Sequence, residues 1–282
     1  MAERRDRTGQ VIGDRFRIED GIGKGAMADV YRALDLKTSA YVALKILRKH
    51  LEHDPQGRQR FEREGAVQAR LRHANVAALL GSGVTAEDEP YLAVELLRGK
   101  TLRGVIKAEG ALAPRRAASY TWQALQGLAA VHESGVMHRD LKPANIMLEP
   151  SPGPIERVVL IDFGFASFEG SARLTAQGAI VGSLSYIASE RFRGEPSDMR
   201  SDLYSMGVIL YEMLVGVPPF KAVNQIELIQ AHLDQLPPPL PEGVAQALQP
   251  IITRALEKQP QARYASALEM AAAVETAAAH LA

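Results

Sequence analysis

The sequence predicts an α+β protein of two parts, in which a small antiparallel β-sheet with one main helix precedes a mainly α-helical region. Strand patterns fill most of residues 15–94, with one helical pattern among them. After Gly99 the apolar residues recur at the spacing of helices instead. We therefore expect a first lobe over residues 15–97 and a second over 98–275. A flexible arm (1–14) and a tail (276–282) complete the chain.

The first lobe contains a strand, residues 41–49, whose two faces differ. Val42, Leu44 and Ile46 share one face, and Ala43, Lys45 and Leu47 share the other. A lysine on an inward face needs an anionic partner, because an unpaired buried charge is costly. The ordinary alternative is a lysine that extends from an edge strand to solvent.

An acid in the next element is the nearest candidate partner. Residues 58–71 read as a helix whose apolar stripe consists of Phe61, Glu64, Gln68 and Leu71. An acid on a core-facing stripe again needs a cation, and Lys45 is the nearest one by chain order. The alternative is that Glu64 is an ordinary solvated helix acid, since charged residues surround it.

The second lobe begins with a helix over residues 114–135, where Pro114 suits a start and Gly135 a stop. Its apolar face is predicted to consist of Trp122, Leu125 and Ala129. A second helix, capped by Ser201 or Asp202 and ended at Gly216, is apolar nearly all round and should be buried. Two further helices are predicted over 245–258 and 266–282.

The composition argues against several classes of protein. Lys+Arg and Asp+Glu both number 33, and this balance argues against a general binder of nucleic acid or membrane surfaces. The chain has no Cys, so disulfides and thiolate metal sites are excluded. No apolar run approaches the ~18 residues of a membrane span, and the first ten residues lack the apolar core of a signal peptide. We expect a cytoplasmic protein without a membrane segment.

Three stretches carry candidate chemistry. IGKGAMADVY places Gly23 and Gly25 between two strands, where backbone N–H groups can approach phosphate, although a plain hairpin turn explains the same glycines. HRDLKPAN combines an acid, a lysine and an amide: Asp140, Lys142 and Asn145. VVLIDFG ends an apolar run on Asp162 and a mobile-looking glycine turn, which an ordinary strand-ending turn also explains.

The order of these features is more specific than any one of them. A glycine loop, a strand lysine, a helix acid, an acid–lysine–amide loop and a final acid are the parts that phosphoryl transfer requires. The lysine and the loop suit phosphates, the amide and the final acid offer oxygen ligands to Mg²⁺, and the middle acid suits an attacking hydroxyl.

These motifs resemble the protein-kinase superfamily, in particular the eukaryotic-like serine/threonine kinases of bacteria. The resemblance covers about residues 15–270 and is most specific in HRDLKPANIM followed by IDFG. It implies a bilobal protein-kinase-like fold and transfer of the γ-phosphoryl group of ATP, with Mg²⁺ or Mn²⁺, to Ser/Thr hydroxyls of protein substrates in bacterial signalling. It also implies autophosphorylation, for which a homodimer acting in trans is one arrangement.

The resemblance assigns a role to each matching residue. It implies that Asp140, Lys142, Lys45 and Glu64 are catalytic, with Asp140 as base and Lys45 paired with Glu64. Nucleotide contacts are implied for Ile22, Gly23, Lys24, Gly25, Val30, Ala43, Lys45, Val94, Glu95, Leu97, Asn145 and Asp162. The resemblance also implies that Asn145 and Asp162 are the metal ligands and that Asp202 braces the backbone of the catalytic loop.

Regulation and departures from the family pattern complete the expectations. Arg139 before the catalytic acid suggests control by a phosphate on the activation loop, with Thr175 the favoured acceptor. Ala28 replaces a loop glycine, and Ser189 replaces a proline before Glu190, whose expected ion-pair partner is Arg263. The Ser189 change predicts a looser loop.

Two other functions compete with the active kinase. One is a pseudokinase that binds ATP as a scaffold, and it is disfavoured because Lys45, Glu64, Asp140, Asn145 and Asp162 are all present. The other is a small-molecule kinase, which usually lacks the DLKPxN sequence found here.

Overall fold

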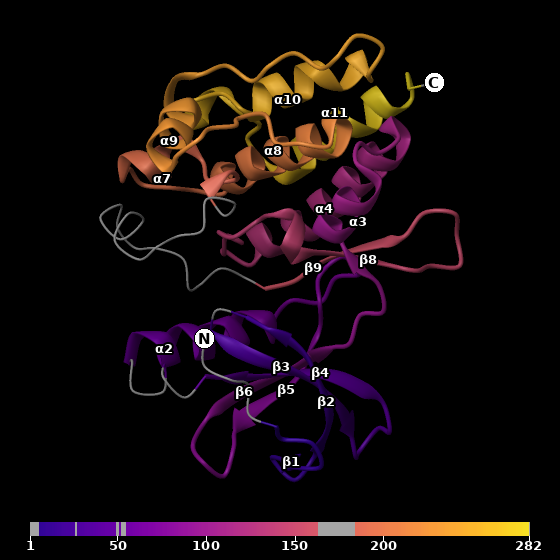
Figure 1. Ribbon diagram of the computed structural model, residues 1–282, viewed down its shortest axis with the longest axis vertical. Coiled ribbons are helices and arrows are strands. Elements are labelled where there is room, and N and C mark those ends of the chain that lie inside the picture. Colours follow the sequence, from indigo (N-terminus) through magenta and orange to yellow (C-terminus); the bar gives the residue numbers. More distant parts are fainter. Residues whose placement is uncertain (1–5, 26, 49–50, 52–54, 163–183, 282) are drawn as a thin grey trace. The chain divides into compact units, whose positions relative to one another are not determined.

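The computed structural model describes residues 6–25, 27–48, 51, 55–162 and 184–281. The chain divides into two compact units, Met1–Arg98 and Gly99–Ala282 (Figure 1). The first unit holds a curled antiparallel sheet and one long helix, and the second is mainly helical. This is the α+β organisation that the sequence predicts. No helix in the described residues has the length and apolar character to cross a membrane.

The first unit is built on an antiparallel sheet with the strand order β1-β2-β3-β4-β6-β5. Its strands are β1 (Val11–Ile12), β2 (Phe16–Lys24), β3 (Ala28–Asp35), β4 (Tyr41–Leu47), β5 (Leu79–Val84) and β6 (Pro90–Glu95). Helix α2 (Pro55–Gln68) packs against β5 and β6. This helix begins at Pro55, three residues before the predicted start. It ends at Gln68, three residues before the predicted end, because the chain turns at residues 69–70.

Strand β4 separates two apolar clusters, as its alternating sequence predicts. Its even-numbered residues join one cluster: Val42, Leu44 and Ile46 with Phe16, Ile18 and Tyr91. Its odd-numbered residues Ala43 and Leu47 join the other cluster, with Phe61 of α2. Lys45 lies between these two on the same face. The sequence pattern therefore fixes which face of the sheet α2 and its acid approach.

The N-terminal arm is tied to the sheet rather than detached from it. Arg7 Nη2 donates to Glu89 Oε1 at 2.5 Å, and both side chains are buried. The N–H of Gly9 donates to the carbonyl of Ile18, and β1 pairs with β2. The prediction of a flexible arm over residues 1–14 is therefore wrong for the described residues 6–14, because an ion pair between distant residues leaves no local pattern.

The second unit contains a small sheet and several helices. A three-stranded antiparallel sheet is formed by β7 (Lys100–Thr101), β8 (Ile146–Glu149) and β9 (Arg157–Leu160). Its α-helices are α3 (Leu102–Glu109), α4 (Pro114–Glu133), α7 (Ser189–Arg193), α8 (Arg200–Val215), α9 (Gln225–Asp234), α10 (Gln249–Ala255) and α11 (Ala267–Ala278). Short 3₁₀ turns cover Pro143–Asn145, Gln246–Leu248 and Pro260–Ala262.

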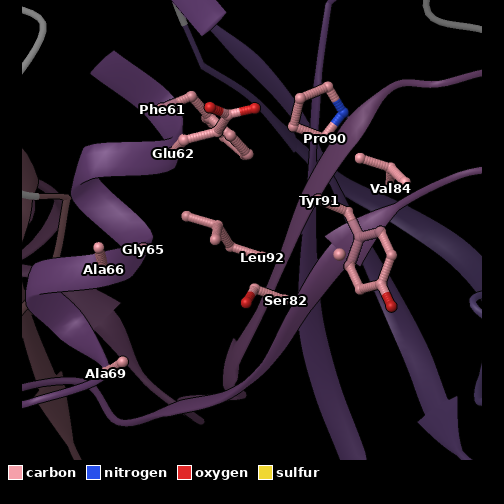
Figure 2. A pocket seen from close by; sticks show the side chains of 11 residues that line it. Phe61, Glu62, Gly65, Ala66, Ala69, Ser82, Val84, Pro90, Tyr91 and Leu92 are labelled. Atoms are coloured by element: carbon pink, nitrogen blue, oxygen red, sulfur yellow. The ribbon is translucent and has the colours of Figure 1, made fainter. Parts of the chain in front are cut away.

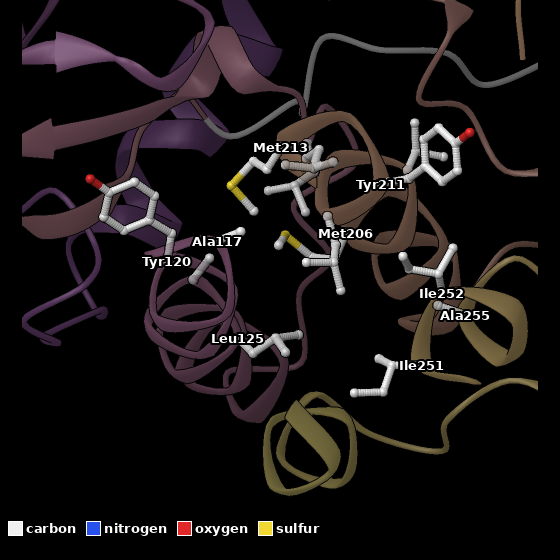
Figure 3. Packing of buried hydrophobic residues seen from close by; sticks show 14 of the residues in the cluster. Ala117, Tyr120, Leu125, Met206, Tyr211, Met213, Ile251, Ile252 and Ala255 are labelled. Carbon is white, nitrogen blue, oxygen red and sulfur yellow. The ribbon is translucent and has the colours of Figure 1, made fainter. Parts of the chain in front are cut away.

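Helix α8 is the centre of the second core, as its apolar sequence predicts. Met206 and Met213 of α8 lie on the side that packs against α4, with Met213 beside Ala117, and α10 packs on another side of α8 through Ile252 (Figure 3). Gly207 allows the approach of α10, since a Cβ there would lie 2.7 Å from the Cβ of Ala255. The buried helix provides a rigid base for the side chains near its N-terminus.

Three local expectations for the second unit need correction. Trp122 is 37% exposed and does not join Leu125 in the core. Helix α8 begins at Arg200, and the carboxylate of Asp202 accepts hydrogen bonds from another segment instead of capping its own helix. Helix α11 extends into the predicted tail, where Leu281 is buried and its carbonyl accepts from Arg115 at 2.5 Å.

Candidate active site

In the first unit, Lys45 and Glu64 form the predicted pair. Lys45 Nζ lies 3.2 Å from Glu64 Oε1, and each side chain is only 12% exposed. Strand β4 supplies the lysine, and the middle of α2 supplies the acid. The pairing satisfies two charges that would each be costly to bury alone. Both alternatives, a lysine extended to solvent and a solvated acid, are excluded by this contact.

The register of the sheet gathers further predicted nucleotide contacts around Lys45. Val30 of β3 pairs with Lys45, and Ala43 pairs with Val94 of β6. Residues directly opposite in an antiparallel pair share a face, so these four side chains lie on one face of the sheet. Gly23 is the register partner of Val30 on the next strand.

The glycine loop closes as a tight hairpin between β2 and β3. The N–H of Gly25 donates to the carbonyl of Ala28 at 2.8 Å, and a Cβ on Gly25 would lie 3.1 Å from that oxygen. Ala28 itself is buried at the start of β3, so its methyl group packs in the apolar cluster with Ala43. The loss of the third glycine therefore leaves the hairpin intact.

The remaining predicted nucleotide contacts lie at the ends of strands. Ile22 is 48% exposed on β2, and Lys24 is exposed at the end of that strand. Glu95 ends β6, and its N–H donates to the carbonyl of Ala78 at 2.9 Å. Leu97 follows β6 in a segment without regular structure.

In the second unit, Asp140 is held by the two residues predicted to act with it. Lys142 Nζ donates to Asp140 Oδ2 at 2.7 Å. Asn145 Nδ2 donates to the same oxygen at 2.9 Å and to the carbonyl of Asp140 at 2.8 Å. The carboxylate remains 34% exposed. The loop thus orients an accessible carboxylate beside a cation. This arrangement suits a carboxylate that accepts a proton from a hydroxyl group.

The backbone before Asp140 adopts a strained turn. Arg139 has φ +65°, and the N–H of Asp140 donates to the carbonyl of His138 at 2.9 Å. A hydrogen bond across one left-handed residue is the rare, strained form of the γ-turn. Such a conformation costs about 1–3 kcal/mol and persists only where its surroundings hold it.

Asp202 supplies part of that support. Its two oxygens accept from the backbone N–H groups of His138 at 2.8 Å and Arg139 at 2.9 Å, and from His132 Nε2 at 2.9 Å. Burial opposes ionisation, but the hydrogen bonds and charge of His132 outweigh it, and the pKa of Asp202 falls below its usual value. Asp202 therefore braces the backbone of the loop before Asp140, as the resemblance implied. His132, a polar residue in an apolar helical stretch, was not singled out from the sequence.

The amide and the second acid fit a hard divalent cation. Because Asn145 donates through its amide nitrogen to Asp140, its amide oxygen remains available as a ligand. The N–H of Ile161 donates to the carbonyl of Asn145 at 3.0 Å, which ties the start of the Asp162 turn to this loop. Asp162 has φ +54°. Oxygen ligands from an amide and a carboxylate suit Mg²⁺ or Mn²⁺, which also take ligands from phosphates. No group of three or more His, Cys, Asp or Glu suited to a metal occurs among the described residues.

Glu190 and Arg263 form the predicted ion pair. Arg263 Nη2 lies 2.7 Å from Glu190 Oε2, and the two side chains are 0% and 2% exposed. Ser189 Oγ donates to the carbonyl of Lys258 at 2.8 Å and accepts from Arg263. The serine that replaces proline thus gains hydrogen bonds of its own, and the expectation of a looser loop stays a prediction.

Several predicted residues lie outside the described part of the chain. These are Phe163 and Gly164, which end the VVLIDFG stretch, and the expected phosphate acceptor Thr175. Gln68, by contrast, is described: it is buried, and its Nε2 donates to the carbonyl of Ala77 at 2.9 Å.

A cavity of about 310 Å³ lies in the first unit between α2 and the β5–β6 hairpin (Figure 2). Phe61 and Leu92 line its apolar floor, and Gly65 leaves room for Leu92 beside the helix. None of the predicted site residues lines this cavity.

Comparison with known proteins identifies the family. The protein kinase domain model matches residues 16–275. Serine/threonine-protein kinase PknB of Mycobacterium tuberculosis is 36% identical over 269 residues, which are 93% of this chain and 42% of that protein. Probable serine/threonine-protein kinase PknB of Corynebacterium glutamicum is 34% identical over 274 residues, again 93% and 42%. The chain thus spans about two fifths of the length of these relatives.

Solved structures give the same result for the fold. The crystal structure of the M. tuberculosis PknI kinase domain superimposes with a TM-score of 0.75 at 24% identity, over 96% of this chain and 98% of that chain. A double mutant of the same kinase domain gives 0.74 at 25% identity, over 99% and 100%. The two PknB relatives are serine/threonine-protein kinases of bacteria, and the chain belongs to the protein kinase family.

Proposed function

We propose that this chain is the catalytic domain of a bacterial serine/threonine kinase, which transfers the γ-phosphoryl group of ATP to protein hydroxyls. The observation that carries the proposal is the accessible carboxylate of Asp140, held at 2.7 Å by Lys142 and at 2.9 Å by Asn145. A carboxylate fixed in this way can orient a serine or threonine hydroxyl and accept its proton.

Each unit contributes residues with a distinct task. We assign Lys45, kept in place by Glu64, to the α- and β-phosphates, and Lys142 to the phosphoryl group that is transferred. Val30, Ala43 and Val94 form the apolar surface assigned to the adenine ring. The cationic side chains of Lys45 and Lys142 offset the negative charge of the phosphates, and this charge stabilisation is the main requirement of the reaction.

Asn145 and Asp162 are the ligands that we assign to the metal, with Mg²⁺ preferred over Mn²⁺ because octahedral oxygen coordination with phosphates suits it. The metal supplies charge neutralisation to the phosphates when it is bound. The chain's own contribution is to fix the amide group of Asn145 through two hydrogen bonds that its nitrogen donates to Asp140, which leaves the amide oxygen as the ligand.

The central experiment compares the wild type with Asp140→Asn in a phosphate-transfer assay. The purified chain with radiolabelled ATP and Mg²⁺ should label itself and a linker histone, and phosphoamino-acid analysis should find serine or threonine. Asp140→Asn should lower the rate at least about 100-fold while the circular dichroism spectrum stays the same. Equal labelling by both proteins would refute the catalytic assignment.

Variations of this assay test the proposed metal preference, the phosphorylation site and transfer between two copies of the chain. Replacing Mg²⁺ by Mn²⁺ tests the metal preference, and mass mapping tests phosphorylation at Thr175. Labelling of a folded Asp140→Asn chain by added wild type tests transfer in trans between two copies. A wild type that binds ATP without transfer would support the scaffold alternative instead. We also propose that the catalytic domain works in the cytoplasm, where ATP is available.

A further inference from the structure

Arg191 of α7 reaches the turn that precedes the catalytic carboxylate. Its Nη1 donates to the carbonyl oxygen of Arg139 at 2.7 Å. That carbonyl belongs to the peptide that joins Arg139 to Asp140. The charged groups that interact with the Arg191 guanidinium include the carboxylates of Asp202 and Asp140 and the guanidinium of Arg139. Arg191 therefore contacts the loop itself, although no sequence motif pointed to it.

The turn at Arg139 is held from both sides. The N–H of Arg139 is bound by Asp202 Oδ1 at 2.9 Å, and its carbonyl is bound by Arg191 at 2.7 Å. Between these two contacts lies the left-handed residue with φ +65°. Strained backbone relaxes unless neighbouring groups oppose it, and these two contacts both oppose relaxation of the peptide before Asp140.

The backbone from which the Arg191 side chain extends is itself held in place. The preceding residue, Glu190, is bound through both carboxylate oxygens to Arg263, at 2.9 and 2.7 Å, and accepts from Ser201 Oγ at 2.5 Å. The backbone at Arg191 is thus fixed by the buried ion pair one residue earlier, and its side chain transmits that fixed position to Arg139.

We propose that Arg191 is a positioning residue for Asp140: its guanidinium fixes the Arg139 carbonyl and thereby the direction in which the catalytic carboxylate projects. This proposal rests on the phosphoryl transfer proposed above. Arginine suits the role because its planar guanidinium directs its donors rigidly, whereas the three donors of a lysine ammonium group rotate at the end of a flexible side chain.

The test uses the purified chain with Arg191→Gln, Arg191→Lys and a matched control, Arg193→Gln, on the same helix. Arg193 is exposed and lies 3.7 Å from Glu195. Arg191→Gln should lower kcat about tenfold or more with KM for ATP within twofold, because the carboxylate is misplaced but ATP contacts are kept. Arg191→Lys should recover part of that loss, and Arg193→Gln should match the wild type.

Hydrogen exchange gives a readout that does not depend on turnover. Amides of residues 138–142 should exchange at least about threefold faster in Arg191→Gln than in the wild type, while amides of α4 stay unchanged. Wild-type kcat in Arg191→Gln, or a rate loss that only follows a smaller folded fraction, would overturn the proposal.

The two proposals fail in different ways. If the wild type transfers no phosphate, the proposed function fails, and the exchange measurement still decides whether Arg191 fixes the loop. If Arg191→Gln does not fold, Arg191→Lys takes its place: a lower kcat with faster exchange at 138–142 supports the role, and wild-type values of both overturn it.

Discussion

The carboxylate of Glu190 and the guanidinium of Arg263 form a two-bond ion pair that is closed to solvent, with N–O distances of 2.9 and 2.7 Å. Burial opposes ionisation of Glu190, but the hydrogen bonds and charge of Arg263 outweigh it and keep its pKa below the usual value. The pair joins α7 to the segment after α10, two parts of the second unit that lie 73 residues apart in sequence.

Loss of this ion pair should lower the stability of the protein strongly. Glu190→Gln should lower the free energy of unfolding by about 3–5 kcal/mol, because Arg263 would stay buried without an anion. Urea unfolding followed by circular dichroism measures this change. Glu195→Gln, which removes an exposed partner of Arg193, should cost no more than about 0.5 kcal/mol. Equal costs for the two variants would contradict the importance of burial.

Asp202 should couple stability to catalysis. Asp202→Asn keeps the size of the side chain but leaves one oxygen for three donors, so about 1–3 kcal/mol of stability should be lost for each donor left unsatisfied. Because the loop before Asp140 loses its brace, kcat should also fall, by tenfold or more. Asp198→Asn, a control at an exposed neighbouring acid, should change kcat less than twofold. Unaltered kcat in folded Asp202→Asn would exclude the bracing role.

His232 should make the protein less stable in mild acid. Burial lowers the pKa of His232 from 6.5 to about 3, and Tyr204 Oη lies 2.8 Å from its Nδ1. Between these two values the unfolded chain binds a proton that the folded chain does not, so this contribution is complete above about pH 6.5 and is lost as the pH falls. From pH 6.5 to 5 it should amount to about 2 kcal/mol.

The measurement for His232 is urea unfolding at a series of pH values. His232→Gln should flatten the slope of stability between pH 5 and 6.5, whatever its effect at neutral pH. His280→Gln replaces an exposed histidine and should leave that slope unchanged. Parallel slopes for the wild type and His232→Gln would show that His232 is not the titrating group.

Alanine substitutions at two helix glycines should change the stability of the chain in different directions. At Gly207 of α8 a Cβ would lie 2.7 Å from the Cβ of Ala255, so Gly207→Ala should destabilise the chain by about 1–3 kcal/mol. At Gly104 of α3 the nearest atom is Thr101 Oγ1 at 3.4 Å, so Gly104→Ala should be neutral or stabilise by up to about 1 kcal/mol. Thermal denaturation of both variants tests the pair, and the same sign for both would contradict it.

Features with a local pattern were predictable from the sequence. The two faces of β4 follow from strict alternation, and the buried character of α8 follows from its continuous apolar run. The pairing of Lys45 with Glu64 was predictable because the order of the motifs is specific to one family.

Features that depend on distant partners were not predictable. Arg191 follows Glu190 in a short polar stretch, and only the folded backbone brings it to Arg139, 52 residues earlier. Trp122 occupies an apolar position of α4 by periodicity, yet the described residues leave it 37% exposed. Local spacing specifies the face of an element, whereas the identity of the segment packed on that face depends on the whole chain.

The contact between Arg7 and Glu89 has a practical consequence for anyone who trims this protein for expression. A shortened version that starts at Arg15, where the first strand signal begins, would remove the only hydrogen-bonding cation that the described residues provide to the buried carboxylate of Glu89. It would also remove β1 and expose the edge of β2 to strand pairing with other molecules. A shortened version should therefore keep Arg7.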